Sequence, residues 1–194
     1  MRSPKANDQT KLALERSARQ FADLGMHAAA CEALEKRAAL SPQNPMIWND
    51  LGVEYAAAGR LNDALSAFRR AHAALPQYPV ALYNLGRFHL DRYQEQQPEP
   101  QSKTPSEPAL GLATKAAEYL QTSLTHDPSL AHSHELLHKA FKILGNTQQA
   151  DHHLAEAIRL NPGLRTLYHP SWIQRLPWVR GPAEYHGPGF LRSR

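Results

Sequence analysis

Residues 45–78 read PMIWNDLGVEYAAAGRLNDALSAFRRAHAALPQY, and this stretch decides the fold. Its apolar side chains recur every three or four positions in two runs separated by Gly59: Trp48, Leu51, Tyr55, then Leu61, Ala64, Leu65, Phe68, Ala71. Such spacing places each run on one face of a helix. Gly59 favours the backbone conformation that ends a helix, and Pro76 stops the second helix. The stretch therefore predicts a helix–turn–helix hairpin.

The same pattern recurs along the chain with a period of 34 residues. Gly25 and Gly59 are separated by one period, whereas Gly59 and Gly145 are separated by two periods plus 18 residues. The interval from Pro76 to Pro128 is one period plus the same 18 residues. Because two independent intervals agree, the sequence predicts four units with one insertion in the third: 11–44, 45–78, 79–130 and 131–164.

The second unit carries a recognisable set of residues, namely Trp48, Leu51, Gly52, Tyr55, Ala64, Phe68 and Pro76. This set resembles the signature of the tetratricopeptide repeat (TPR), a 34-residue helix–turn–helix unit. The resemblance implies an all-α fold, an α–α solenoid in which four such units form a right-handed superhelix. One helix pair cannot bury its own apolar face, and about three stacked repeats are needed for stability. Four units are therefore expected to fold alone.

Three segments depart from the repeat. Residues 92–109 hold four prolines and few apolar side chains, and we expect them to form a loop between the two helices of the third unit. Residues 1–10 are expected to be a frayed N-terminus. Residues 165–194 form a tail rich in Pro, Arg and Trp. Its apolar side chains either cover the last repeat or serve as a recognition peptide: Trp172, Ile173, Leu176 and Trp178.

Composition and charge exclude several classes of protein. The net charge of +4 comes from residues 163–194, where five arginines stand against Glu184. The rest of the chain is electrically balanced, so we expect no specific nucleic-acid partner. A single cysteine, Cys31, excludes an internal disulfide. The sequence shows no secretory signal and no long apolar run, so we expect a cytoplasmic protein without a membrane span.

One motif suggests chemistry. Residues 134–138 read HELLH, and H-E-x-x-H on a helix is the pattern of zinc-dependent hydrolases. However, both histidines fall at packing positions of the fourth unit, and Phe141 replaces the glycine of one known continuation of the motif. The candidate third ligands lie off the packing face of the following helix: His152, His153 and Glu156. We therefore expect no catalytic residue, no metal and no cofactor, and keep the hydrolase as an alternative.

The resemblance implies a binding surface on the first helix of each unit, in the concave groove. The residues predicted to line it are Arg19, Asn49, Val53, Tyr83, Asn84, Arg87, Glu135 and Lys139. Asn84 matches a position where related arrays hydrogen-bond a ligand's backbone. Glu15 and Asp50 fall where some relatives have residues that clamp a terminal carboxylate, so too few cations converge for that clamp. The mixture of Tyr83, Arg87 and Lys139 suits a peptide with apolar and acidic side chains.

The sequence thus favours a non-catalytic scaffold for protein–protein interaction, which binds a peptide or helix of another protein. Besides the hydrolase, it leaves open a protein that assembles with copies of itself through the ends of the stack or through the tail.

Overall fold

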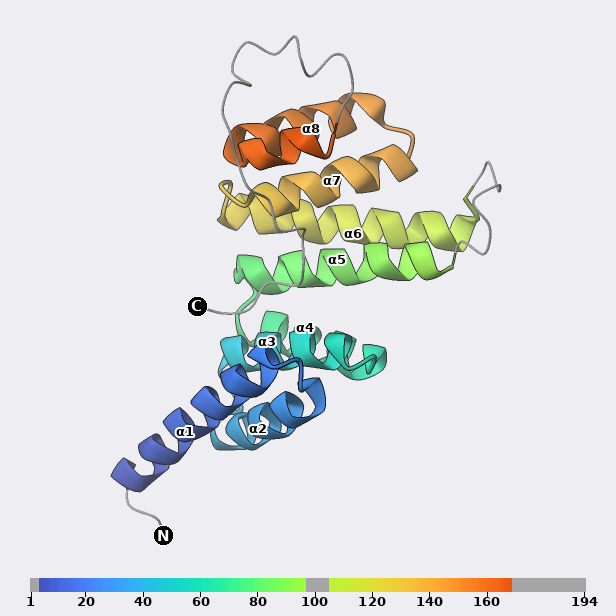
Figure 1. Ribbon diagram of the computed structural model, residues 1–194. Helices are drawn as coiled ribbons and strands as arrows, with labels where there is room; N and C mark the ends of the chain where they lie inside the picture. Colours follow the sequence, from blue (N-terminus) through green and yellow to red (C-terminus); the bar gives the residue numbers. More distant parts are fainter. Residues whose placement is uncertain (1–3, 97–104, 169–194) are drawn as a thin grey trace. The chain divides into compact units, whose positions relative to one another are not determined.

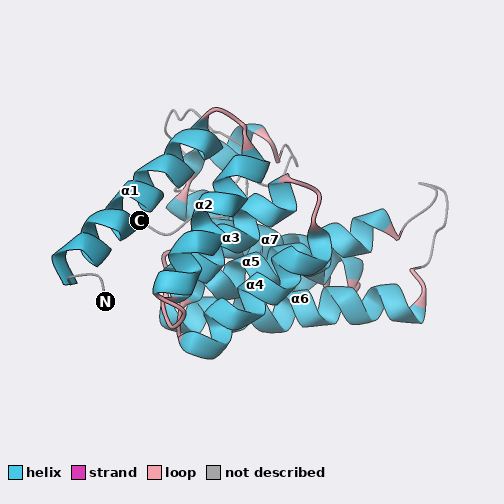
Figure 2. Cartoon of the chain, turned by 90° about the horizontal axis from the view of Figure 1, so that it is seen from below, coloured by secondary structure: helices cyan, strands magenta, loops and turns pink. Residues whose placement is uncertain are grey.

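A computed structural model describes residues 4–96 and 105–168, and these contain helices but no strand (Figures 1 and 2). The elements are α1 (Pro4–Asp23), α2 (His27–Leu40), α3 (Pro45–Ala57), α4 (Leu61–Ala74), α5 (Pro79–Glu95), α6 (Glu107–His126), α7 (Ala131–Ile143), α8 (Thr147–Leu160) and the short 3-10 helix η1 (Pro162–Thr166). The prediction of an all-α fold built from helix pairs is confirmed. Helices α3, α5 and α7 begin at the residues where the 34-residue frame starts its second, third and fourth units.

The described residues divide into two compact units, and the division along the chain falls within α5, between Asn84 and Leu85. In the first unit, α1 with α2 and α3 with α4 form two hairpins, and α2 packs against α3 (Figure 1). In the second unit, α7 and α8 form a hairpin, and α6 packs against α7. Within each unit, the second helix of one repeat therefore contacts the first helix of the next.

The turn between paired helices is built in the same way in three repeats. Gly25, Gly59 and Gly145 have φ angles of 70°, 75° and 74°, a region that other residues rarely adopt. The amide that follows each glycine donates to a carbonyl five residues earlier, as in Met26 N to Phe21 O at 2.8 Å. This is the pattern that ends a helix at a left-handed residue. The next helix begins two residues after each glycine.

The two helices of a repeat approach each other most closely where the first helix has a glycine. A Cβ atom on Gly52 would lie 2.5 Å from Cε1 of Phe68, and one on Gly86 would lie 2.5 Å from Cγ of Leu120. Both neighbours are fully buried. The fourth repeat has His138 at this position, and its Nδ1 lies 3.0 Å from the carbonyl oxygen of Ala150 on α8. The imidazole thus packs against the opposite backbone through a hydrogen bond.

The insertion is shorter in the structure than the sequence suggests, because both flanking helices extend into it. Residues 92–95 continue α5, where Arg92 pairs with Glu95 at 2.7 Å, and residues 107–109 belong to the first turn of α6. Pro108 does not prevent this, since a proline in the first turn of a helix costs no internal hydrogen bond. The prediction of a loop over all of 92–109 is therefore wrong at both ends.

The N-terminal prediction also needs correction. Residues 4–10 belong to α1, which begins at Pro4, although the sequence suggests a frayed end. A proline in the first turn is compatible with a helix start. At the other end, η1 places Leu164 in a buried cluster with Leu154 and Ile158, and Tyr168 packs against it. Leu164 and Tyr168 thus cover part of α8. The predicted covering residues Trp172, Ile173, Leu176 and Trp178 lie outside the described residues.

The close approach of α5 and α6 predicts opposite effects for two glycine-to-alanine changes in one repeat. Gly86→Ala should lower the free energy of unfolding by about 1–3 kcal/mol, because the new Cβ meets the buried Leu120. Gly111→Ala, in an open part of α6, should raise it by about 0.5–1 kcal/mol through helix propensity. Urea unfolding of both variants is the measurement. Equal effects would contradict the close approach.

Candidate protein-interaction site

The structure separates the eight predicted groove residues into two groups. Three reach the surface: Arg19 is exposed, and Arg87 and Lys139 are partly exposed. The other five are buried: Asn49, Val53, Tyr83, Asn84 and Glu135. Sequence spacing identifies the helix face on which a residue lies but not how deeply its neighbours cover it, so the two groups look alike in the sequence.

The buried asparagines link two first helices within the first unit. Nδ2 of Asn84 on α5 donates to Oδ1 of Asn49 on α3 at 2.7 Å, and Nδ2 of Asn49 donates to Oδ1 of Asp50 at 3.4 Å. A side-chain amide can donate and accept at the same time, so Asn49 accepts from Asn84 while it donates to Asp50, and these bonds fix the orientation of its amide group. The pair therefore positions α3 and the start of α5, in addition to any ligand contact.

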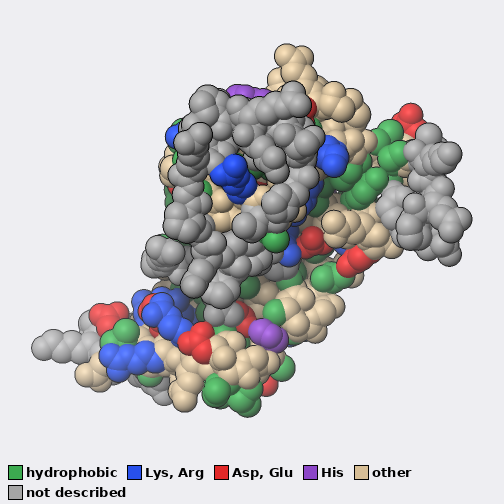
Figure 3. All heavy atoms as spheres, turned by 45° about the horizontal axis from the view of Figure 1, so that its top comes forward, with side chains coloured by type: hydrophobic (Ala, Val, Ile, Leu, Met, Phe, Trp, Pro, Cys, Tyr) green, Lys and Arg blue, Asp and Glu red, His purple; other side chains and the backbone are tan. Residues whose placement is uncertain are grey.

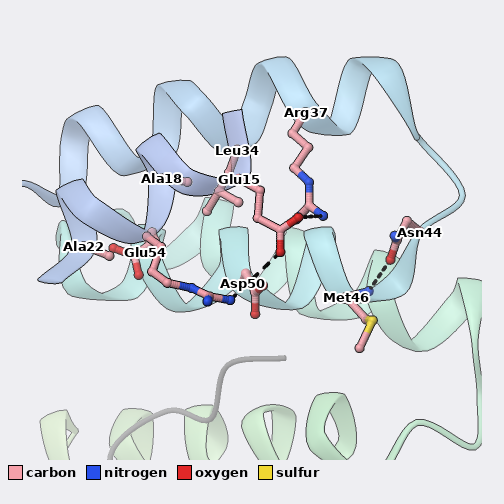
Figure 4. Close-up of a pocket in the computed structure, with 10 residues that line it drawn as sticks. Glu15, Ala18, Ala22, Leu34, Arg37, Asn44, Met46, Asp50 and Glu54 are labelled. Atoms are coloured by element: carbon pink, nitrogen blue, oxygen red, sulfur yellow. Dashed lines mark hydrogen bonds and ion pairs between the residues drawn. The ribbon is translucent and has the colours of Figure 1, made fainter. Parts of the chain in front are cut away.

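The first unit has a hollow of about 110 Å³ between α1, α2 and α3, which we call the α1–α3 hollow (Figure 4). Its lining residues are Glu15, Ala18, Arg19, Ala22, Leu34, Arg37, Asn44, Met46, Asp50 and Glu54. Small and apolar side chains from α1, α2 and α3 line one part of it, and the carboxylates of α1 and α3 lie beside the guanidinium groups of Arg19 and Arg37. Both the predicted Arg19 and the two acidic residues noted in the sequence, Glu15 and Asp50, meet here.

Charge in the α1–α3 hollow is mixed but has more acidic than basic residues. Arg37 Nη2 lies 2.8 Å from Glu15 Oε2, and Arg19 lies 3.9 Å from the other oxygen of the same carboxylate. The remaining acidic residues are Asp50 and Glu54, and Glu54 Oε2 lies 2.9 Å from His27 Nδ1. Figure 3 shows acidic and basic side chains side by side over the first unit, in the lower part of the view. The hollow thus holds three carboxylates and two guanidinium groups.

The second unit has its own hollow, of about 230 Å³, between α5 and α7, which we call the α5–α7 hollow. It is lined by Arg87, Leu90, Asp91, Gln94, Leu136, Lys139 and Ile143. Arg87 Nε lies 3.3 Å from Asp91 Oδ2, and Lys139 Nζ lies 3.0 Å from Glu135 Oε1. Burial raises the pKa of the Asp91 carboxyl, although the neighbouring Arg87 acts in the opposite direction. Two predicted groove cations therefore line a hollow that also holds three apolar side chains, Asp91 and Gln94.

The residues of the HELLH motif make contacts within the fold. His134 Nδ1 lies 3.0 Å from His153 Nδ1, and His138 binds the backbone of Ala150. The hydroxyl of Tyr168 donates to Glu135 at 2.9 Å, and Lys139 pairs with the same carboxylate. Among the residues that the structure describes, no group of three or more His, Cys, Asp or Glu is placed to hold a metal ion. The sequence prediction that His153 lies off the packing face is wrong, because its side chain is buried.

Burial also governs how these histidines titrate. It is the largest cause that lowers the pKa of His134 and His138 below 6.5 and the pKa of His153 to about 4, where charges on neighbouring histidines act in the same direction. The His153 ring stacks on Phe141, with ring centres 5.6 Å apart. At neutral pH these imidazoles are therefore neutral members of the α7–α8 packing.

The thiol of Cys31 is a poor nucleophile. Cys31 is buried, and burial raises the pKa of its thiol to about 11, so the thiol is protonated at neutral pH.

Within the described ranges, none of the helices combines the length and the apolar character needed to cross a bilayer.

Comparison with known proteins gives a result at the level of structure. No protein-family model and no curated protein sequence matches the chain. Among solved structures, that of MamA covers 84% of this chain and 85% of its own, at 20% identity and a TM-score of 0.64. TTC0263, a thermophilic TPR protein of Thermus thermophilus, is 22% identical, with a TM-score of 0.66 and coverage of 80% of this chain and 77% of its own.

A third similar structure was solved with a ligand. It is the first TPR of Spaghetti (RPAP3) bound to the HSP90 peptide SRMEEVD, at 18% identity and a TM-score of 0.57. The match covers 71% of this chain and 94% of that one. At these identities the likeness establishes the fold, which agrees with the repeat signature of residues 45–78.

The contacts of the HELLH motif predict how the protein behaves toward zinc. Elemental analysis of purified, tag-free protein should find far less than one zinc per chain, because His134 and His138 are occupied in packing between α7 and α8. His138→Ala should leave this low content unchanged. A content near one zinc per chain that is lost in His138→Ala would contradict the assignment.

Burial of neutral histidines predicts that acid destabilises the protein. A histidine whose pKa is depressed in the folded state binds protons more readily when the chain is unfolded. Its contribution to the free energy of unfolding is therefore complete above about pH 6.5 and falls as the pH drops toward the folded pKa. With a folded pKa of about 4, His153 alone should lower the free energy of unfolding by about 2 kcal/mol between neutral pH and pH 5.

Urea unfolding at pH 7.5 and pH 5 checks this dependence. His153→Gln should reduce the loss of stability between the two pH values, whereas His126→Gln, at an exposed position, should leave it unchanged. If both variants keep the wild-type dependence, the acid sensitivity does not come from the α7–α8 histidines.

Proposed function

We propose that this protein, which has the fold of the tetratricopeptide-repeat proteins, is a non-catalytic scaffold that binds a peptide or helix of another protein on its first helices. The single observation that carries the proposal is the α5–α7 hollow, where Arg87 and Lys139 flank Leu90, Leu136 and Ile143. Two cations beside three apolar side chains in a mixed hollow suit a segment with a large apolar side chain next to carboxylates.

Seven of the eight predicted groove residues have a role in this proposal. Arg87 and Lys139 contact the partner's carboxylates, whereas Arg19 lines the α1–α3 hollow, which is not assigned to the acidic segment. The buried residues act by positioning these helices: Asn49, Val53, Tyr83, Asn84 and Glu135. Glu135 illustrates the role, because its bonds to Lys139 and Tyr168 hold the ammonium group at the edge of the hollow.

The ligand seen in a similar structure supports the same chemistry. The peptide SRMEEVD contains Met and Val among three acidic residues and one arginine. The present chain has Glu15 and Asp50 in its α1–α3 hollow, where such a peptide would meet like charges. An acidic and apolar segment is therefore assigned to the α5–α7 hollow, and a terminal-carboxylate clamp is not part of the proposal.

Selection from a displayed peptide library tests this assignment without knowledge of the natural partner. Peptides that bind the full chain should be rich in Asp or Glu next to Leu, Ile, Met or Val. For a selected peptide, the double variant Arg87→Gln, Lys139→Gln should weaken binding by about tenfold, since two charge pairs are lost.

Lys115→Gln serves as the control, because Lys115 is exposed on α6 and does not line the hollow. It should leave the affinity unchanged, and unfolding curves should show that all variants remain folded. Selection of basic peptides, or equal affinity for the wild type and the double variant, would contradict the proposal.

A further inference from the structure

The first unit has a further hollow, of about 520 Å³, on α4, which we call the α4 hollow. Its described lining residues all belong to this one helix: Asn62, Leu65, Ser66, Arg69, Arg70 and Ala73. The opposite face of α4 packs in the repeat, where Ala64, Phe68 and Ala71 are buried and Phe68 meets Gly52 of α3. In addition to supporting α3, α4 therefore presents a second face, on which Leu65 is partly buried and the other lining residues are exposed.

The lining positions of the α4 hollow follow the spacing by which one helix contacts another. They fall at i, i+3, i+4, i+7, i+8 and i+11 from Asn62, so they share one face of α4 over about three turns, or about 16 Å. A second helix laid along such a face meets these side chains with the same spacing of its own. Leu65 and Ala73 give the face an apolar surface at which such a helix packs.

The α4 hollow carries positive charge that the described residues do not balance. It holds Arg69 and Arg70, and none of its described lining residues is acidic. The one acidic residue in the sequence of α4 is Asp63, and its carboxylate pairs with Arg60 at 2.7 Å. Among the described residues, neither Arg69 nor Arg70 forms an ion pair or a hydrogen bond through its side chain. The face thus suits a partner that supplies carboxylates.

One of the two arginines is oriented before any ligand binds. Cζ of Arg70 lies 4.6 Å from the centre of the Trp48 ring, so its guanidinium group stands over the indole. The indole is itself held, because its Nε1 donates to the carbonyl oxygen of Pro42 at 2.7 Å. A guanidinium group on an aromatic face keeps the N–H groups at its edge for an anion. Because Arg70 is already ordered, it loses less side-chain entropy when a carboxylate binds.

We propose that the α4 hollow binds an acidic amphipathic helix of a partner protein. Carboxylates of that helix pair with Arg69 and Arg70, while its apolar side chains pack on Leu65 and Ala73. The unbalanced charge of the hollow is the reason for an acidic occupant, and the spacing of its lining residues is the reason for a helix. The inference goes beyond the proposed function, because it assigns a second interaction surface to a second helix, away from the α5–α7 hollow.

A synthetic helix tests the proposal on the full chain. The probe is a fluorescent peptide of about four turns, which side-chain staples hold helical and which carries a stripe of Leu with Glu beside it. Fluorescence anisotropy should show binding of this peptide and much weaker binding of a matched peptide in which Lys replaces Glu. Failure of the Glu peptide to bind, or equal binding of the Lys peptide, would overturn the proposal.

Charge variants identify where the peptide binds. Arg69→Gln with Arg70→Gln should weaken binding of the Glu peptide by about tenfold, since two charge pairs are lost. Arg16→Gln should leave the affinity unchanged, because Arg16 is exposed on α1 and lies outside the hollow. Unfolding curves should show that all variants remain folded. Equal affinity of the wild type and the Arg69, Arg70 variant would overturn the proposal.

The indole of Trp48 reports directly on the Arg70 contact. Its ¹H–¹⁵N resonance, assigned by its absence in Trp48→Phe, should move when the Glu peptide binds and stay in place with the Lys peptide. A peptide of the same composition that two prolines keep extended should bind at least about tenfold more weakly. Equal binding of the extended peptide, or the same movement of the resonance with excess inorganic phosphate, would overturn the assignment of a helix in favour of a general anion site.

Two controls separate this surface from the α5–α7 hollow and from a second copy of the chain. Arg87→Gln with Lys139→Gln should leave the affinity for the Glu peptide unchanged. Loss of binding in that variant, but not in the Arg69, Arg70 variant, would overturn this inference and leave the proposed function standing. A mass that rises with protein concentration in light scattering, and falls to the monomer in the Arg69, Arg70 variant, would overturn the inference in favour of self-association.

Discussion

The close contact between the two helices of each repeat is the constraint on which the rest of the structure depends. In two repeats this contact requires a glycine on the first helix against a fully buried Phe68 or Leu120 on the second. In the fourth repeat an imidazole bonds the opposite backbone at the same position. Because this face of the first helix packs against the second helix of the same repeat, only the other faces can contact the next repeat or a ligand.

The α1–α3 and α5–α7 hollows lie mainly on first helices, whereas the α4 hollow is lined by residues of a second helix. The α1–α3 hollow takes most of its lining from α1 and α3, and the α5–α7 hollow takes all of its lining from α5 and α7. Their chemistry differs, because the α1–α3 hollow holds three carboxylates and two guanidinium groups, whereas the α5–α7 hollow holds two cations and the single carboxylate of Asp91. A common fold thus carries two surfaces with different preferences, so fold alone does not determine the partner.

Much of the fold could be predicted from sequence because the repeat period determines where helices start and stop. The glycines at 25, 59 and 145 and the prolines at 45 and 79 mark turns and helix starts that recur in the structure. The extensions of α5 and α6 could not be predicted, since composition suggested a loop while local ion pairs such as Arg92–Glu95 act only once the helix forms. Residues 4–10 were missed because their polar composition suggested a frayed end.

The candidate site was predicted less completely. Spacing identified Arg19, Arg87 and Lys139 on the first helices, but it could not distinguish them from Asn49 or Glu135, which neighbouring helices bury. The contacts of the HELLH motif depend on His153 and Tyr168, which lie 15 or more residues away in the sequence. No local sequence pattern reveals such pairings, because the partner residues come from other elements and their burial depends on the packing of α7 against α8.

The central claim is that the first helices bind the partner while the second helices support them. Hydrogen–deuterium exchange of the full chain, with and without a saturating selected peptide, tests this claim most directly. The account predicts that bound peptide slows exchange in α5 and α7 and leaves the exposed side of α6 unaffected. Protection confined to α6 or α8, or no protection in α5 and α7 at saturation, would contradict it.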